Sequence, residues 1–349
     1  MPVTVVVGGQ FGSEGKGKVA HFLAKERRIR FAIRVGGPNS GHTVIDSNGR
    51  AVIFRHLPTA CLLPDVVSVI PPGSYLDVSI LLSELRHVSE DPRRVVVDPQ
   101  AWVVEQGDIE SESRGGLSKA IGSTGSGTGA ALVRRILRSS KGTFAKDVPQ
   151  LRPYIRDTAE LLANALHHGQ RAIVEGTQGF GLSLLHSNLY PYCTSRDTGA
   201  ASFVSEAGLS PIDVDEIILV IRTFPIRVAG ASGPLHNEID WETVTAESGY
   251  QHPLVEYTSV THRIRRVARF DPDVVTRAIA HNRPTYIALN HLDYVDATCA
   301  RQGRLTPRAL DFVRQTEQLI GTRISLLGYG PASLTWRDLK ARKAGPNVR

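Results

Sequence analysis

The sequence predicts an α/β fold in which a large, mostly parallel central sheet is flanked by helices. Three observations support this prediction: short apolar runs rich in Val and Ile, helical spacing between many of them, and polar loops directly after the runs. Buried parallel strands form uninterrupted apolar runs, and alternation of strand with helix is the pattern of an α/β protein.

Several apolar runs have the length and composition of buried strands. They are Val3–Val7, Phe31–Val35, Val66–Ile70, Arg94–Val97, Ala172–Glu175, Glu216–Arg222 and Thr285–Asn290. Helical spacing predicts helices at Lys18–Glu26, Ser79–Arg86, Ala131–Arg138, Ile155–His168 and Pro272–Asn282. No clear boundary divides the chain, so we expect residues 1–349 to form a single domain, with 340–349 as a flexible tail.

The bulk composition favours an anionic ligand. The net charge of +7 and the basic isoelectric point suit a nucleotide, a phosphate or a nucleic acid. No basic tail with interleaved aromatic residues is present, which disfavours direct nucleic-acid binding. The three cysteines lack C-x-x-C spacing, and no apolar run is long enough for a membrane span. We therefore expect a cytoplasmic protein without a signal peptide or a membrane partner.

The first candidate site is the glycine-rich stretch GGQFGSEGKGK, which follows the first predicted strand. Its glycines permit close backbone approach, and its amide groups can form an anion nest at the start of a helix. The stretch is not a P-loop, because that motif needs glycine at Gln10 and Ser or Thr at Gly17. A tight turn with exposed lysines is the alternative, but it needs fewer glycines.

The next loops add polar groups. Arg34–Val44 contains His42, a residue type suited to donating a proton to a departing oxygen, although a lone loop histidine is usually solvated. Leu117–Ala131 is glycine-rich and predicts an irregular active-site loop, with a flexible linker as the alternative. Its hydroxyls suit phosphate oxygens. Glu175–Ala201 follows a strand and supplies a further set of amides and hydroxyls.

Two later segments complete the set. Arg263, Arg265 and Arg266, within Thr258–Asp271, can clamp a carboxylate or phosphate, unless they only form a solvated basic face. Asn290-His291-Leu292-Asp293 is close to N-K-x-D, in which the aspartate binds guanine. In an open α/β sheet such loops gather at the carboxyl edge of the strands, so we expect one crevice that holds more than one anion.

Taken together, these segments resemble the signatures of the adenylosuccinate synthetase family. The family patterns are G-x-Q-W-G-D-E-G-K-G-K, G-G-x-N-A-G-H-T, G-S-T-x-x-G-x-G, E-G-A-Q-G, Y-P-x-x-T-S and T-G-R-x-R-R, and versions of all occur here in order, followed by LLGYGPA. The resemblance implies a P-loop-NTPase-like adenylosuccinate synthetase fold. It also implies a ligase in which a nucleoside triphosphate phosphorylates O6 of a purine nucleotide and the amine of L-aspartate then displaces that phosphate.

The departures from these signatures resemble the phage and archaeal branch, the N6-succino-2-amino-2'-deoxyadenylate synthases. That branch acts on dGMP in the pathway to 2-aminoadenine DNA, with ATP or dATP as donor. The family aspartate that takes the N1 proton is Ser13 here. An aspartate at N1 crowds the 2-amino group of guanine, whereas serine removes volume and charge and can accept a hydrogen bond there. Serine is a weak base, so the sequence leaves open which group takes the N1 proton.

The resemblance implies roles residue by residue. The catalytic residues implied are Ser13, His42 and Gln178. The implied triphosphate contacts are Gly12, Ser13, Glu14, Gly15, Lys16, Gly17, Lys18, Gly41, His42, Thr43, Asn290, Asp293, Gly328, Gly330 and Pro331. The implied dGMP contacts are Ser13, Asn39, Ser123, Thr124, Arg138, Gln178, Thr194 and Val228. The implied aspartate contacts are Thr261, Arg263 and Arg265, and the implied Mg²⁺ ligands are Ser13 and Gly41.

Two partner predictions follow from the same resemblance. Arg138 matches the arginine that reaches the partner subunit's nucleotide, which implies a homodimer. The substrates are then dGMP, L-aspartate and a triphosphate, in the cytoplasm, or in the host cytoplasm for a phage-encoded chain.

Two other readings remain. The chain can be an ordinary synthetase that uses IMP and GTP, because Asp293 is retained, although His291 in place of lysine favours ATP or dATP. A nucleotide sensor or DNA-binding protein leaves the clamp of Arg263 and Arg265 without a use.

Overall fold

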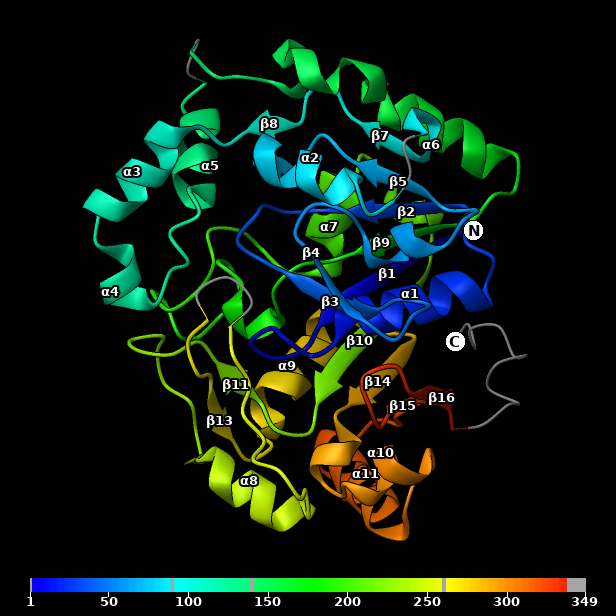
Figure 1. The fold of residues 1–349 in the computed structure, drawn as a ribbon, viewed down its shortest axis with the longest axis vertical. Coiled ribbons are helices and arrows are strands. Elements are labelled where there is room, and N and C mark those ends of the chain that lie inside the picture. Colours follow the sequence, from blue (N-terminus) through cyan, green and yellow to red (C-terminus); the bar gives the residue numbers. More distant parts are fainter. Residues whose placement is uncertain (1, 89–90, 139–140, 259–261, 338–349) are drawn as a thin grey trace.

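The structure, a computed structural model, describes residues 2–88, 91–138, 141–258 and 262–337. Its centre is a nine-stranded sheet with the order β16-β15-β14-β10-β1-β9-β2-β5-β7 (Figure 1). All neighbouring pairs are parallel except β15 with β16. The predicted α/β fold with a large, mostly parallel sheet is therefore confirmed.

The strands of this sheet are mostly those that the apolar runs predict. Their bounds are β1 (Val3–Gly8), β2 (Phe31–Arg34), β5 (Val67–Ile70), β7 (Val95–Val97), β9 (Ala172–Glu175), β10 (Val214–Arg222), β14 (Tyr286–Asn290), β15 (Leu326–Gly328) and β16 (Leu334–Trp336). The central strand β1 is buried along its whole length, between β9 and β10.

Helices cover both faces of the sheet. Their bounds are α1 (Lys16–Glu26), α2 (Val78–Leu85), α3 (Gln106–Arg114), α4 (Leu117–Ile121), α5 (Thr128–Ile136), α6 (Thr158–His167), α7 (Ala200–Glu206), α8 (Trp241–Ser248), α9 (Pro272–Asn282), α10 (Thr298–Gln302) and α11 (Pro307–Ile320). None of these helices is long and apolar enough to cross a membrane.

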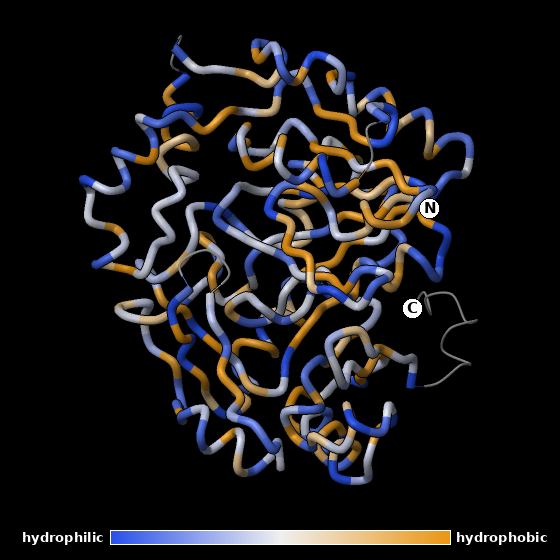
Figure 2. The backbone as a smooth tube through the Cα atoms, in the orientation of Figure 1, coloured by the Kyte–Doolittle hydropathy of each residue, from blue (hydrophilic) through white to orange (hydrophobic). Residues whose placement is uncertain are grey.

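The alternation of side chains along β1 divides the core into two layers. Val5 and Val7 pack in one cluster with residues of α6, α7, α9 and α11. Val6 points the other way and packs against α1 through Val19 and Leu23. In Figure 2 the hydrophobic segments accordingly concentrate in the middle of the molecule. Because both faces are covered, the strands read as continuous apolar runs rather than as alternating ones.

Smaller sheets flank the site. The pairs are β3 (His42–Ile45) with β4 (Ala51–Phe54), and β6 (Tyr75–Leu76) with β8 (Trp102–Val103). A three-stranded sheet joins β11 (Ile226–Arg227), β13 (Arg266–Ala268) and β12 (Glu238–Ile239). It lies beside α8 at the lower left of Figure 1, and α3, α4 and α5 lie above it at the upper left.

The glycine-rich segment Leu117–Ala131 is more ordered than expected. It contains the short helix α4, and the following helix begins at Thr128 rather than three residues later. The cause is a distant cap: the carboxylate of Glu112 in α3 accepts hydrogen bonds from the backbone amides of Gly127, at 2.9 Å, and Gly129, at 2.7 Å. Such a nonlocal cap is invisible to a local reading of the sequence.

Candidate active site

The carboxyl ends of the parallel strands meet at one edge of the sheet and border a cavity of about 420 Å³. The order of the strands changes side at β1: β2, β5 and β7 lie on one side of it, and β10 and β14 lie on the other. Open α/β folds bind their ligands at such a point. Thirteen of the predicted site residues line this cavity. They are Gly12, Ser13, Lys16, Asn39, Gly41, His42, Ser123, Thr124, Gln178, Thr194, Val228, Arg263 and Arg265.

The loop between β1 and α1 is built around Glu14. Its buried carboxylate accepts hydrogen bonds from the backbone amides of Gln10 and Gly12, at 3.1 and 2.9 Å, and from Lys16 Nζ at 2.6 Å. Gly15 caps α1 in a left-handed conformation without any side-chain cap. The first amides of α1 are therefore not capped by a side chain, and a helix N-terminus of this kind attracts an anion.

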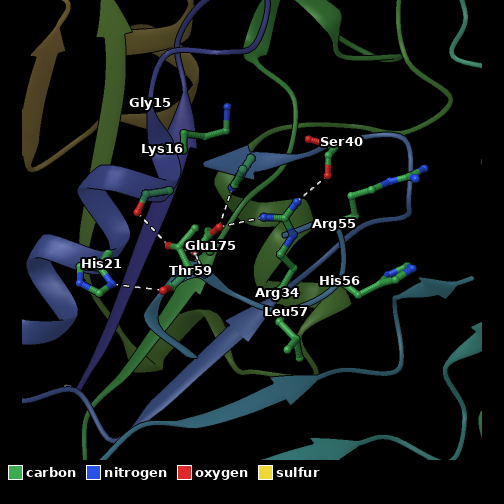
Figure 3. A network of polar contacts seen from close by, with 12 residues as sticks. Gly15, Lys16, His21, Arg34, Ser40, Arg55, His56, Leu57, Thr59 and Glu175 are labelled. Carbon is green, nitrogen blue, oxygen red and sulfur yellow. Dashed lines mark hydrogen bonds and ion pairs between the residues drawn. The ribbon is translucent and has the colours of Figure 1, made fainter. Parts of the chain in front are cut away.

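A buried carboxylate orients His42. Glu175 lies between Arg34 and Thr59 at the end of β9 (Figure 3). One of its oxygens is 2.6 Å from His42 Nδ1 and 2.8 Å from a guanidinium nitrogen of Arg34. The other oxygen accepts from the backbone amide and the hydroxyl of Thr59, at 2.9 and 2.7 Å. The carboxylate fixes the proton on Nδ1 and leaves Nε2 for chemistry.

Burial sets the protonation of this pair. Desolvation, with Arg34 as the next cause, lowers the pKa of His42 to about 3, so the imidazole is neutral in the free protein. The pKa of Glu175 is lowered to about 2, because its hydrogen bond and charge contact with His42, together with Arg34, outweigh the opposing effect of burial. A phosphate placed beside His42 favours its charged form and raises its pKa.

Ser13 is held between two arginines. Its backbone lies in the left-handed region, at φ 56°. Arg222 donates to the Ser13 carbonyl at 3.0 Å, and Arg265 donates to the Ser13 hydroxyl. Glu256 contacts both arginines: its carboxylate accepts a hydrogen bond from Arg222 at 3.2 Å and lies 3.9 Å from Arg265 Nε.

A second group of predicted residues gathers on the other side of the loop. Asn290 Nδ2 donates to the Glu14 carbonyl at 2.7 Å, and Lys18 Nζ donates to the Gly330 carbonyl at 3.0 Å. Asp293 is buried and accepts from the hydroxyl of Tyr250 at 2.7 Å. Burial raises the pKa of Asp293, whereas desolvation lowers that of Lys18 to about 8.

The remaining predicted residues have varied positions. Gly17 packs against Thr59 and beside His42, so a side chain at Gly17 meets both. Arg138 is exposed, just after α5, and does not line the cavity. Thr261 and the tail 340–349 lie outside the described residues.

Comparison with known proteins assigns the family. A family model described as adenylosuccinate synthetase matches residues 5–144 and 138–300. The chain belongs to the adenylosuccinate synthetase family. Curated adenylosuccinate synthetases are similar over nearly their whole length. The one from Methanococcus aeolicus is 36% identical, over 95% of this chain and 97% of that protein. The one from Thermococcus sibiricus is 37% identical, over 95% and 96%.

Solved structures agree on the fold. The succinoaminodeoxyadenylate synthetase of cyanophage S-2L, bound to dGMP and to dATP as an energy donor, superposes with a TM-score of 0.81 at 29% identity and covers 96% of this chain. That match extends over 95% of the phage chain. A fully ligated adenylosuccinate synthetase from Plasmodium falciparum has a TM-score of 0.85 at 19% identity, over 97% of this chain and 100% of that one. The chain has the adenylosuccinate synthetase fold. Members of this family are C–N bond-forming ligases that use Mg²⁺ and a nucleoside triphosphate.

Several residues of this synthetase site had no role in the sequence-based reading. Glu175 and Arg34 belong to recognised segments, but their contact joins positions far apart in the chain. Arg222 ends a predicted strand and looks like a strand terminus rather than a site residue. Glu256 precedes the arginine clamp without a motif of its own. A buried charge at the end of an apolar run was the available signal for Glu175 and Arg222.

The side chains of the site provide few ligands for a permanently bound metal ion. Within the described parts of the chain, no three His, Cys, Asp or Glu side chains form a group that could hold one. Mg²⁺ prefers oxygen ligands, including one or two carboxylates or substrate phosphates. The predicted ligands Ser13 and Gly41 both border the cavity. Because they supply only neutral oxygens, they suit an ion that arrives with the triphosphate.

Proposed function

We propose that this enzyme joins L-aspartate to C6 of dGMP through a 6-phosphoryl intermediate, with ATP or dATP as phosphoryl donor. The product is N6-succino-2-amino-2'-deoxyadenylate, a precursor of 2-aminoadenine DNA. The observation that carries this proposal is Ser13: a small, neutral residue occupies the cavity at the position of the family aspartate. The resemblance to the dGMP-bound phage enzyme supports it.

The purine nucleotide occupies the main cavity in this proposal. Asn39, Ser123, Thr124 and Thr194 bind its phosphate and sugar with neutral donors. Gln178 follows β9, in the loop after Glu175, with a positive φ of 63°, a conformation that recurs at functional sites when the surrounding structure holds it. Val228 gives the sugar an apolar neighbour without a hydrogen-bond partner for a 2'-hydroxyl.

His42 acts as the acid in this scheme. With Nδ1 fixed on Glu175, Nε2 is the nitrogen available to O6 or to the γ-phosphate. The negative charge of the bound substrate phosphates raises the pKa of His42. The imidazole therefore gains its proton only when the nucleotides are bound. Arg263 and Arg265 bind the aspartate carboxylates, together with Thr261.

The triphosphate lies along the loop before α1 and next to Asn290. Lys16 and the uncapped amides of α1 hold its phosphates, with Thr43 alongside. Its base reaches Asp293, whose carboxylate is already bound by Tyr250. His291 stands in place of the family lysine, and this change supports ATP or dATP over GTP. Gly41 and Ser13 would help to hold Mg²⁺ beside the phosphates, and the ion would supply neutralisation of phosphate charge there.

The partner subunit completes the phosphate site. Arg138 is exposed at the end of α5, beside Val133, Ile136 and Leu137, which expose more than half of their surface. An apolar patch next to an exposed arginine suits a twofold interface in which each Arg138 reaches the other cavity. We therefore include a homodimer in the proposal.

One alternative keeps specific support. The most similar curated relatives reported above are ordinary adenylosuccinate synthetases, and the guanine-reading aspartate is retained as Asp293. On that reading the enzyme uses IMP and GTP, and Ser13 is a tolerated change.

A crossed assay separates the two candidates. The protein is incubated with L-aspartate and Mg²⁺, and each of IMP, GMP and dGMP is paired with each of ATP, dATP and GTP. Phosphate release and the succinylated product are both measured. We expect dGMP with ATP or dATP to give the highest kcat/KM. If IMP with GTP is the best pair, the dGMP assignment is wrong and the alternative holds.

A further inference from the structure

The hydrogen bonds of Ser13 assign a direction to its hydroxyl. A guanidinium has donors but no acceptor, so in the contact between Arg265 and Ser13 the Oγ atom accepts. The hydroxyl's own proton is left for another acceptor.

The rest of the surroundings offers Ser13 no help as a base. Activation of a serine needs a neighbouring general base. Among the described residues, no carboxylate or imidazole hydrogen-bonds to the Ser13 hydroxyl. The adjacent Glu14 carboxylate is turned inward onto Gln10, Gly12 and Lys16. Arg265 is also held in place, since its backbone amide donates to the Glu256 carbonyl at 2.8 Å and its Nε donates to the Tyr257 carbonyl at 3.0 Å.

We propose that Ser13 is a hydrogen-bond donor to the unprotonated N1 of the purine, aligned by Arg265 and Glu256, and that it is not the base that removes the N1 proton. This inference rests on the proposed function only in that a 6-oxopurine nucleotide presents its N1 edge to Ser13. Transfer of the N1 proton to water or to a phosphate oxygen of the bound triphosphate leaves a negative charge shared by N1 and O6, and a donor at N1 stabilises that anion. Ser13 keeps its own proton throughout.

Glu256 is a positioning residue in this arrangement. It pairs with the fully buried Arg222, which holds the Ser13 carbonyl, and lies beside Arg265, which holds the Ser13 hydroxyl. The same carboxylate is thus linked to both the backbone and the side chain of Ser13. Arg222 and Arg265 hold the pKa of Glu256 at about 2, so the carboxylate stays charged.

The test compares two probes that differ at N1. dGMP carries a proton on N1, whereas 2-aminopurine-2'-deoxyriboside 5'-monophosphate has an unprotonated N1 and no 6-oxygen. Dissociation constants are measured by calorimetry for the full-length wild type and for Ser13→Ala. A donor at residue 13 matches the analogue, so its affinity falls roughly tenfold in the variant, the value of about one good hydrogen bond. The affinity for dGMP falls by much less.

Two further variants serve as controls for the Ser13→Ala measurement. Ser13→Gly tests the same loss without backbone strain, because glycine adopts a positive φ freely. Ser111→Ala in α3 removes an exposed hydroxyl outside the cavity and is the matched control, with no expected change for either probe. An equal loss of both probes, or a larger loss of dGMP, overturns the donor role.

The role of Ser13 can be tested independently of whether the natural substrate is dGMP or IMP. IMP and purine riboside 5'-monophosphate form a second pair with the same difference at N1. If dGMP fails to bind and IMP binds, the dGMP proposal fails while the second pair still tests Ser13. Glu256→Gln is expected to weaken analogue binding about threefold through misalignment of Arg265, with triphosphate affinity unchanged. Loss of triphosphate affinity to the same extent indicates a merely structural role for Glu256.

Discussion

Ser13 combines a left-handed backbone with a side chain that faces the cavity, a pairing that persists only where surrounding contacts hold it. Those contacts are the two arginines, Arg222 and Arg265. A residue fixed in this way cannot move aside for a larger base edge. Its size and charge therefore select among purines directly, which makes it the most informative position for mutation.

Ser13→Asp is predicted to exchange the substrate preference. A carboxylate adds volume beside the 2-amino group and cannot donate to an unprotonated N1, so kcat/KM for dGMP should fall at least tenfold, about 1.4 kcal/mol. With IMP, which lacks the 2-amino group, the same carboxylate can act as a base and turnover should rise. Steady-state kinetics with both nucleotides measure the change, and Ser111→Asp, outside the cavity, is the control. An undiminished dGMP rate would count against the role given to Ser13.

Glu175→Gln is predicted to lower kcat by roughly tenfold to a hundredfold, because a residue that orients a catalytic group typically has effects of that size. The neutral amide no longer fixes the proton on His42 Nδ1. The matched control is Glu84→Gln, which removes another buried carboxylate bound to the backbone amides of His56 and Leu57. The control should lower the melting temperature but leave kcat largely intact. Similar kcat losses in both variants would point to a general packing defect.

At the residue scale, the sequence identified the cavity's own polar groups but missed the groups that hold them. His42 and Ser13 stand in short glycine-rich motifs that can be read locally. Glu175, Arg222 and Glu256 act across 34 to 209 residues of separation, and no local pattern encodes such pairs. Arg34 is missed for the same reason.

Among the elements, α2 depends on a histidine outside it. His56 is buried, and its Nε2 accepts from the backbone amide of Asp77 at 3.1 Å, at the start of α2. Only the neutral ring can accept this bond. Burial and then Arg34 lower the pKa of His56 to about 3, despite the opposing charge of Asp77, and Arg55 adds to the lowering.

This arrangement predicts a pH-dependent stability. The unfolded chain binds a proton on His56 below its ordinary pKa of 6.5, and the folded protein does not until about 3. Stability from His56 is therefore present above pH 6.5 and is lost as the pH falls, by up to about 1.4 kcal/mol per pH unit. The difference in unfolding free energy between wild type and His56→Gln, from urea denaturation at pH 7 and pH 5, measures it. A loss of stability in His56→Gln that is the same at both pH values would contradict this prediction.

Element types were predictable where the pattern is continuous. The strand at Ala172–Glu175 and the helix at Pro272–Asn282 match their predicted bounds, because each has a clear apolar pattern and sharp ends. The strands β15 and β16 were missed, since three-residue strands carry too few side chains to form a pattern. The start of α5 was misplaced because Glu112 caps it from another helix.

On the scale of the whole molecule, the dimer proposal makes a complementation prediction. Arg138→Ala and His42→Asn should each have little activity alone. In a mixed dimer, one cavity has both an intact His42 and the partner's intact Arg138. Random exchange in an equal mixture then restores about a quarter of the sites, because half of the dimers are mixed and one of their two sites is whole.

The recovery is followed by product formation after the two variants are mixed and incubated, with each variant alone as the control. Analytical ultracentrifugation reports whether the wild type is a dimer at the assay concentration. No recovery from a mixture that demonstrably exchanges subunits would mean that Arg138 serves its own subunit or none.

The central position of β1 has a consequence for synthesis on the ribosome. Val3–Gly8 is made well before its partners, Ala172–Glu175 and Val214–Arg222. At ordinary translation speeds the apolar strand waits about 10 to 40 seconds before β10 has been made. Throughout that interval an unpaired apolar strand is available to neighbouring nascent chains. The geometry that gives the catalytic loop its central place therefore also leaves its strand unpaired on the growing chain until β9 and β10 have been translated.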